Sequence, residues 1–302
     1  LAYSFVNGLN DASHSIATVV ATKALSPLKA VLYAAVCNTI GPFVFATAVA
    51  VTIGTAIVSG SGLTPLSIVV AIGAAIILVF VAARAGLPIS SSQAMVGGLI
   101  GAGIAVAGLA ALIVPSISQL EQVVFYCLVG GVIGAIVLGL FTAVFREGIG
   151  FGAILGAVCG AALIIPVLMI VGVLKISGLL AIVLFIFITP IIGIVGAFLF
   201  DILISHIFRH SRRNRMKRIF QPLHVIACLV QATAHGANDG QYAVGIITAL
   251  LVSSGLLFTF DVPVWVILMS AIAIGLGTCF GGWQVVDKMA KGITKIRPYQ
   301  GF

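Results

Sequence analysis

The sequence predicts an all-α, polytopic membrane protein built as an inverted-topology repeat with discontinuous helices. Hydrophobic residues make up 61% of the 302 residues and charged residues only 7%, whereas soluble domains carry about 25% charged residues. No Asp, Glu, Lys or Arg lies between Lys29 and Arg84, or between Arg84 and Glu121. Apolar runs beyond about 18 residues can cross a bilayer as helices, and these runs lack the strict alternation of membrane β-strands.

Turn-forming residues divide the chain into its expected spans. The first span ends before Ser26-Pro27, and the second ends at the Ser-Gly-Ser-Gly stretch that begins at Ser59. Gly86-Leu87-Pro88 separates the third span from the fourth, Pro115 precedes the fifth, and charged or glycine-containing stretches separate the others. The expected spans are residues 1–25, 28–58, 63–83, 88–113, 118–145, 149–173, 178–208, 221–253 and 262–286.

A short polar motif occurs twice inside this apolar chain. The sequence GLND, from Gly8 to Asp11, recurs as GAND, from Gly236 to Asp239, an offset of 228 residues. An Asp at the centre of a membrane helix costs about 2.5 to 3.5 kcal/mol. Two of only seven acidic residues lie in these motifs, which indicates one site built from two related halves. We therefore expect a first repeat at 1–113, connecting helices and a basic loop at 114–220, and a second repeat, incomplete at its C-terminal end, at 221–302.

Basic residues predict the orientation. Most of the 15 Lys and Arg residues fall into two clusters, within 209–218 and 288–297, which the positive-inside rule places in the cytoplasm. At the 228-residue offset, cationic segments align with uncharged ones; Lys288, for example, aligns with Gly60. Such a swap is expected of an inverted repeat. We expect a multi-pass protein of the plasma membrane, without a cleavable signal peptide, whose net charge of +8 does not indicate nucleic acid.

The two motifs have the composition of an ion site. Gly8 and Gly236 are expected to break their helices, which frees backbone groups at membrane depth. Half-helix N-termini then attract anions, while freed carbonyls and an Asp hold Na⁺ or a proton. The alternative is that the Asn–Asp pairs cap helices at interfacial loops. His14 and His235 flank the motifs as proton relays or as structural histidines, and His224 is expected at the membrane interface beside the basic loop.

A second constellation follows Pro88. Three serines, Ser90 to Ser92, open an apolar helix rich in glycine. Hydroxyls and unpaired N–H groups at a positive helix end form a plausible oxyanion cradle. The alternative is a serine N-cap at the membrane surface.

These residues resemble the inorganic phosphate transporters of the PiT type along essentially the whole chain. The resemblance lies in GLNDASHSIAT from Gly8, GLPISSSQ from Gly86 and GANDGQYAVG from Gly236. His14 stands where the family usually has Asn, and Ser91-Ser92-Gln93 replaces Thr-Thr-His. The family's second serine–threonine segment would fall near position 318, beyond the end of the sequence.

The resemblance implies symport of phosphate with Na⁺ or H⁺ by alternating access, with no cofactor. Alternatives are a sulfate permease of the same family, a passive anion channel, or a membrane-embedded hydrolase or phosphotransferase. The sequence lacks the G-x-S-x-G and H-E-x-x-H motifs, so we expect no enzyme. Helix-packing glycines make a homodimer plausible. The implied phosphate ligands are Ser90, Ser91, Ser92, Asn10, Asp11, Asn238, Asp239 and Gln241. The implied Na⁺ or proton ligands are Asp11, Asp239, Asn10, Asn38 and Ser15, although Asn38 is equally suited to an interhelical hydrogen bond.

Overall fold

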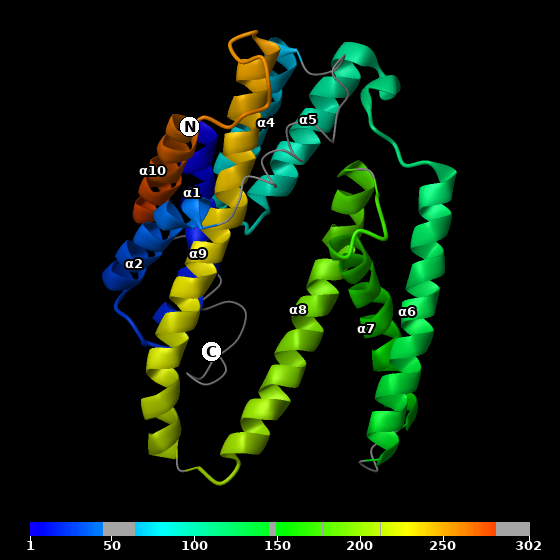
Figure 1. Ribbon diagram of the computed structural model, residues 1–302. Coiled ribbons are helices and arrows are strands. Elements are labelled where there is room, and N and C mark those ends of the chain that lie inside the picture. The colour runs from blue at the N-terminus through cyan, green and yellow to red at the C-terminus, as the bar shows by residue number, and fades with distance from the viewer. Residues whose placement is uncertain (45–63, 145–148, 177, 212, 282–302) are drawn as a thin grey trace. The chain divides into compact units, whose positions relative to one another are not determined.

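The structure, a computed structural model, describes residues 1–44, 64–144, 149–176, 178–211 and 213–281 (Figure 1). The described residues form α-helices and two short 3-10 helices, without a β-strand, so the predicted all-α fold class is confirmed. The α-helices are α1 (Ala2–Ala21), α2 (Pro27–Ile40), α4 (Pro65–Ala85), α5 (Ser91–Ala107), α6 (Ile117–Val144), α7 (Ile149–Ile170), α8 (Gly178–Phe208), α9 (Arg213–Ser253) and α10 (Val264–Phe280). The 3-10 helices are η1 (Gly41–Phe43) and η2 (Leu109–Ala111).

The helices fall into two compact units. One unit comprises Leu1–Leu112 and Ser211–Phe302, and the other comprises Ile113–His210. Four described helices, α4, α6, α7 and α8, are long and apolar enough to cross a membrane. Large apolar side chains are exposed along them, such as Leu66 on α4 and Ile154 on α7. Such wide apolar surfaces suit contact with lipid better than contact with water.

The helix lengths refine the expected spans. The expected fourth span contains α5, which has only 17 residues and is about 25 Å long, less than the roughly 30 Å hydrocarbon core. Conversely, α9 has 41 residues, because the basic segment expected to be a loop forms its first turns. Parts of the expected spans 28–58 and 262–286, and the whole basic segment 288–297, lie outside the described residues.

The expected breaks at Gly8 and Gly236 are wrong, because α1 and α9 run unbroken through both motifs. The two glycines serve close packing instead. A Cβ on Gly8 would overlap the backbone of Ile274 in α10, and a Cβ on Gly236 would overlap the backbone of Asn38 in α2. The absence of a side chain therefore lets the motif helices approach their neighbours at backbone distance.

The chain is interrupted instead between α4 and α5. Gly86 ends α4 with φ 66° and ψ 33°, the left-handed conformation that glycine adopts without steric cost. Ser90 then begins α5, and its side chain accepts a hydrogen bond from the Gln93 N–H. This short connection places the N-terminal end of α5, with Ser91 and Ser92, against α1 and α9.

Helix α1 lies at the centre of its unit and contacts α2, α4, α9 and α10 (Figure 1). The rings of Phe5 and Phe280 lie 5.7 Å apart, while Gly8 packs near Ile274 and Thr278. As the α1 number rises the α10 number falls, so the two helices are antiparallel. The polar residues of α1 are consequently enclosed by other helices.

The second unit contains a close helix pair, α6 and α7. Gly134 of α6 and Gly156 of α7 face each other, and a Cβ on either would overlap the other's backbone. Small residues allow this approach between membrane helices, where packing replaces the hydrophobic effect as the driving force. Val123, Ile165 and Ile188 then form the core between α6, α7 and α8.

Candidate functional site

Asp11 is buried in the middle of α1, with 3% of its surface exposed. Its Oδ1 accepts a hydrogen bond from Asn10 Nδ2 at 2.7 Å and lies 3.3 Å from His14 Nδ1. Its Oδ2 accepts from Ser91 Oγ at 3.0 Å. Both carboxylate oxygens therefore have partners, as a buried acid requires.

Asp239 on α9 has matching surroundings. It is 8% exposed, its Oδ1 accepts from Asn238 Nδ2 at 2.9 Å, and its Oδ2 accepts from Ser92 Oγ at 3.1 Å. Each Asp thus accepts hydrogen bonds from the Asn before it and from one of two consecutive serines. The N-terminus of α5, which suits negative charge, joins the two motifs.

Further hydrogen bonds fix α5 in this position. Tyr3 of α1 donates from its hydroxyl to the Ser91 carbonyl at 3.0 Å, and Asn10 Nδ2 donates to the Ile89 carbonyl at 2.9 Å. The connection before α5 is therefore attached to α1 through backbone carbonyls. This attachment positions the Ser91 hydroxyl at Asp11.

His235 lies between the two carboxylates. Its Nε2 is 3.4 Å from Asp11 Oδ2 and 3.6 Å from Asp239 Oδ2. Ligand atoms of these three residues all lie within 4.8 Å of one another. The group is therefore compact enough to hold one small cation.

A chain of hydrogen bonds fixes the orientation of this imidazole. Thr278 Oγ1 donates to the Ile274 carbonyl at 2.9 Å, so it accepts from Asn38 Nδ2 at 2.8 Å. Asn38 Oδ1 then faces His235 Nδ1 at 3.0 Å and must accept its proton. A neutral ring would direct the Nε2 lone pair at two carboxylates, so a proton or a metal cation must lie on that side for the contacts to be attractive.

The Phosphate transporter family matches residues 7–153 and 150–302. The chain belongs to this family. Its members are transporters, so the protein is a transport protein rather than an enzyme, and the resemblance found in the sequence is confirmed.

Individual proteins similar to this chain are also described as phosphate transporters. The chain is similar to a probable low-affinity inorganic phosphate transporter of Rhizobium meliloti (strain 1021), with 34% identity over 303 residues that cover 100% of this chain and 72% of the relative. A protein with the same description from Bacillus subtilis (strain 168) is 31% identical, with coverage of 100% and 72%. A solved structure, described as "The sodium-dependent phosphate transporter", shares the fold, with a TM-score of 0.62 and 20% identity over 99% of this chain and 78% of that one.

In this member of the phosphate transporter family, most of the predicted site residues lie close together. Asn10, Asp11, Ser91, Ser92, Asn238 and Asp239 form the cluster described above, and Asn38 joins it through His235. Their roles in binding phosphate or a cation stay predictions. Gln241 is buried on α9, one turn after Asn238.

Two predicted residues form no hydrogen bond with this cluster among the described residues. Ser90 is exposed and caps α5, as the alternative N-cap reading proposed. Ser15 is buried, and its hydroxyl has no hydrogen-bond partner among the described residues. The structure therefore links neither side chain to the carboxylates.

Several residues that contact the cluster were not singled out as ligands from the sequence, among them Tyr3, His14, His235 and Thr278. Tyr3 and Thr278 have no distinguishing pattern, since both lie outside the two acidic motifs and the serine segment. His235 did have a signal, because it precedes Asp239 by four residues and so lies on the same face of α9. That spacing could have placed it among the site residues.

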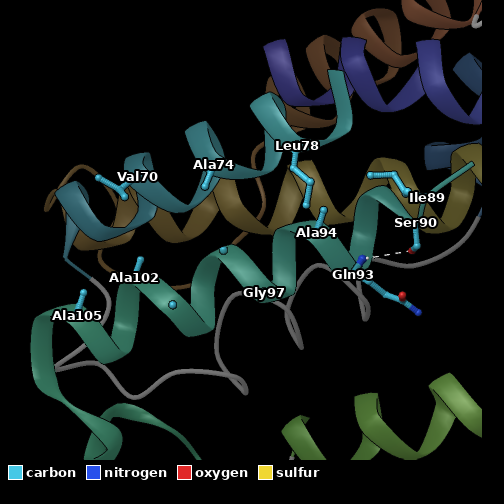
Figure 2. A pocket seen from close by; sticks show the side chains of 12 residues that line it. Val70, Ala74, Leu78, Ile89, Ser90, Gln93, Ala94, Gly97, Ala102 and Ala105 are labelled. Atoms are coloured by element: carbon cyan, nitrogen blue, oxygen red, sulfur yellow. Dashed lines mark hydrogen bonds between the residues drawn. The ribbon is translucent and has the colours of Figure 1, made fainter. Parts of the chain in front are cut away.

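Ser90 lines a groove between α4 and α5 with a volume of about 690 Å³ (Figure 2). Its apolar part is lined by Gly97, Ala102 and Ala105 of α5 and by Val70 and Ala74 of α4. Figure 2 shows Ser90 and Gln93 at one end of the groove, joined by a hydrogen bond. The groove therefore has one polar end, next to the serines of the site, and is otherwise apolar.

His224 forms a second polar contact between α1 and α9. The histidine expected at the membrane interface is 1% exposed, and its Nε2 and Nδ1 lie 3.0 Å and 3.2 Å from the hydroxyl oxygens of Thr18 and Thr22. His224 contacts Thr18 and Thr22, whereas His235, farther along α9, contacts Asp11, which comes earlier in α1. Helices α1 and α9 are therefore antiparallel and are joined by two histidine contacts.

We expect His224→Leu to lower the melting temperature of the purified protein without changing phosphate affinity. The change removes two buried hydrogen bonds, worth about 0.5 to 1.5 kcal/mol each. Differential scanning fluorimetry and phosphate binding measure the two effects, with the exposed His210→Leu as control. An unchanged melting temperature would contradict a stabilising role for this contact.

Proposed function

We propose that this protein moves inorganic phosphate across the plasma membrane by symport with H⁺ or Na⁺, through alternating access. The observation that carries the proposal is the meeting of two acidic motifs, Asp11 on α1 and Asp239 on α9, at the Ser91-Ser92 end of α5. Family membership supports phosphate as the substrate. The solved structure that shares the fold is described as a sodium-dependent transporter, which supports coupling to a cation.

The anion would be held by donors rather than by basic residues. Ser91, Ser92 and the N-terminus of α5 supply hydroxyl and N–H donors, and the carboxamides of Asn10 and Asn238 are close by. In the present conformation both hydroxyls donate to carboxylates. Phosphate would take these donors, and the carboxylates would then turn to a cation.

Electrostatics makes coupling to a cation necessary. An anion about 4 Å from one carboxylate is repelled by about 4 kcal/mol at an effective dielectric constant of 20. A proton or Na⁺ at Asp11, His235 and Asp239 offsets this repulsion, so each ligand favours binding of the other. The hydrogen-bond chain through Asn38 and Thr278 supports this position, because it leaves His235 Nε2 facing both acids.

Uptake of labelled phosphate into proteoliposomes tests the proposal. We expect uptake driven by an inward Na⁺ gradient or by an inward proton gradient, and little uptake without either. The gradient that drives uptake identifies the coupling ion. Absence of uptake under both gradients would reject symport, uptake that needs no gradient would indicate a channel, and strong competition by unlabelled sulfate would favour the sulfate permease.

His235→Gln is expected to lower uptake about tenfold or more. Glutamine can still hydrogen-bond to Asn38, but it cannot carry a proton between the two carboxylates. Initial uptake rates at several proton gradients measure the effect, with His206→Gln, an exposed histidine of α8, as control. Wild-type rates in His235→Gln would exclude a role for the imidazole in coupling.

The topology is also a proposal. We propose that the basic segments 209–218 and 288–297 are cytoplasmic, as the positive-inside rule predicts, and that 1–113 and 221–302 are inverted repeats. A cysteine introduced at Arg215, which is exposed at the start of α9, should react with an impermeant thiol reagent only in opened or inside-out vesicles. Cross-linking in native membranes tests whether the protein forms the expected homodimer.

A further inference from the structure

A tyrosine on α9, Tyr242, occupies the place in the second motif that His14 occupies in the first. It lies 228 residues after His14, the offset that relates the two motifs, and three residues after Asp239. Side chains three residues apart are neighbours on a helix surface. His14 Nδ1 lies 3.3 Å from Asp11 Oδ1, and the Tyr242 side chain interacts with Asp239. Each acid therefore has a ring with a polar group on the same face of its helix.

The Tyr242 hydroxyl is hydrogen-bonded to Ser92, and the direction of this bond can be assigned. A serine hydroxyl has one proton to donate. Ser92 Oγ donates that proton to Asp239 Oδ2 at 3.1 Å, so in its contact with the phenol the serine oxygen must accept. Tyr242 therefore directs its own proton at a serine whose proton is already held by the second acid.

We infer that Tyr242 is a direct phosphate ligand, whose hydroxyl is the third donor of the anion cradle formed with Ser91 and Ser92. This inference deepens the proposed function and rests on it. The sequence predicted Ser90 for the third place, but Ser90 is exposed and caps α5. A phenol from α9 would take the place of that serine, so the cradle would be built from two helices instead of one.

Binding of phosphate would change the partner of the phenol. When Ser92 turns its proton from Asp239 to a phosphate oxygen, that oxygen lies next to Ser92 Oγ, the atom that the phenol already contacts. Hydrogen bonds to ionised acceptors are shorter and roughly twice as strong as bonds to neutral ones. The phenol proton therefore gains by turning from the neutral serine oxygen to the anion, which requires rotation about only one C–O bond.

The other phenol beside the serines, that of Tyr3, is not free to make this change. Its hydroxyl donates to the Ser91 carbonyl at 3.0 Å, a backbone acceptor that stays in place whether or not an anion is bound. Tyr3 is only 3% exposed, whereas Tyr242 is partly exposed. Tyr3 consequently positions α5, and Tyr242 is the phenol that can reach the anion.

Binding of labelled phosphate to the purified protein tests the inference, with Tyr242→Phe as the variant. The change removes the hydroxyl and keeps the ring, so the melting temperature should stay near that of the wild type. Loss of a hydrogen bond to a charged group should raise the phosphate Kd about tenfold or more. The KM of uptake should rise by a similar factor, while the maximal rate at saturating phosphate changes less than about twofold. Tyr33→Phe, which removes an exposed hydroxyl on α2, is the matched control and should bind phosphate like the wild type. A wild-type Kd in Tyr242→Phe would show that the phenol is not a ligand.

A double-mutant cycle separates direct contact from an effect transmitted through Ser92. If Tyr242 only positioned Ser92, Tyr242→Phe would no longer change the phosphate Kd once Ser92 had been replaced by alanine. We expect Tyr242→Phe to weaken phosphate binding several-fold in the Ser92→Ala protein as well. No further loss in that background would overturn the direct contact. Tyr242-dependent phosphate binding by a protein that shows no gradient-driven uptake would instead overturn only the proposed symport.

Discussion

Asp11→Asn and Asp239→Asn are each expected to lower phosphate uptake about 100-fold or more, while the protein stays folded. Asparagine has nearly the shape of aspartate, and its Oδ1 can accept the serine hydrogen bond that each acid now accepts. It cannot supply the negative charge that holds a proton or Na⁺ near His235. A 100-fold loss corresponds to about 2.7 kcal/mol, a reasonable value for one charge in a buried ion site.

Initial uptake rates in proteoliposomes measure this effect, and size-exclusion chromatography checks folding. Asp201→Asn, which changes an exposed acid of α8, is the matched control and should retain wild-type uptake. Normal uptake in Asp11→Asn or Asp239→Asn would disprove that the two carboxylates form one ion site. Loss in only one variant would assign the coupling ion to that Asp alone.

Gly8→Ala and Gly236→Ala are expected to destabilise the protein strongly. In each case the added Cβ overlaps backbone atoms of a neighbouring helix, Ile274 for Gly8 and Asn38 for Gly236. Backbone cannot move aside as a flexible side chain can, so the helices must separate, at a cost of about 3 kcal/mol. We expect lower melting temperatures and a reduced yield of folded protein.

Gly73→Ala is the control for this pair. Gly73 lies inside α4 with no atom within 4 Å of the added Cβ, and alanine is the better helix former by about 1 kcal/mol. Its melting temperature should stay equal or rise. If Gly8→Ala and Gly73→Ala behaved alike, the close contact of α1 with α10 would not contribute to stability.

Much of the architecture could be predicted from local properties of the chain. Hydropathy and the spacing of turn residues indicated the helices, because the bilayer requires long apolar segments with internally paired backbones. The two motifs indicated which acids matter, because an Asp inside a membrane helix is costly and is therefore kept mainly where it has a function. The prediction of helix breaks at Gly8 failed because glycine permits both a break and a close helix contact, and its neighbours in α10 are distant in the sequence.

The sequence alone therefore determined an all-α membrane fold, the family and the pair of acidic motifs. Only the tertiary structure decided that Ser91 and Ser92, but not Ser90, reach the two carboxylates, and that His235 lies between them. The physical reason is that hydropathy and helix propensity act within a segment, whereas contacts between α1, α5 and α9 depend on how distant segments pack.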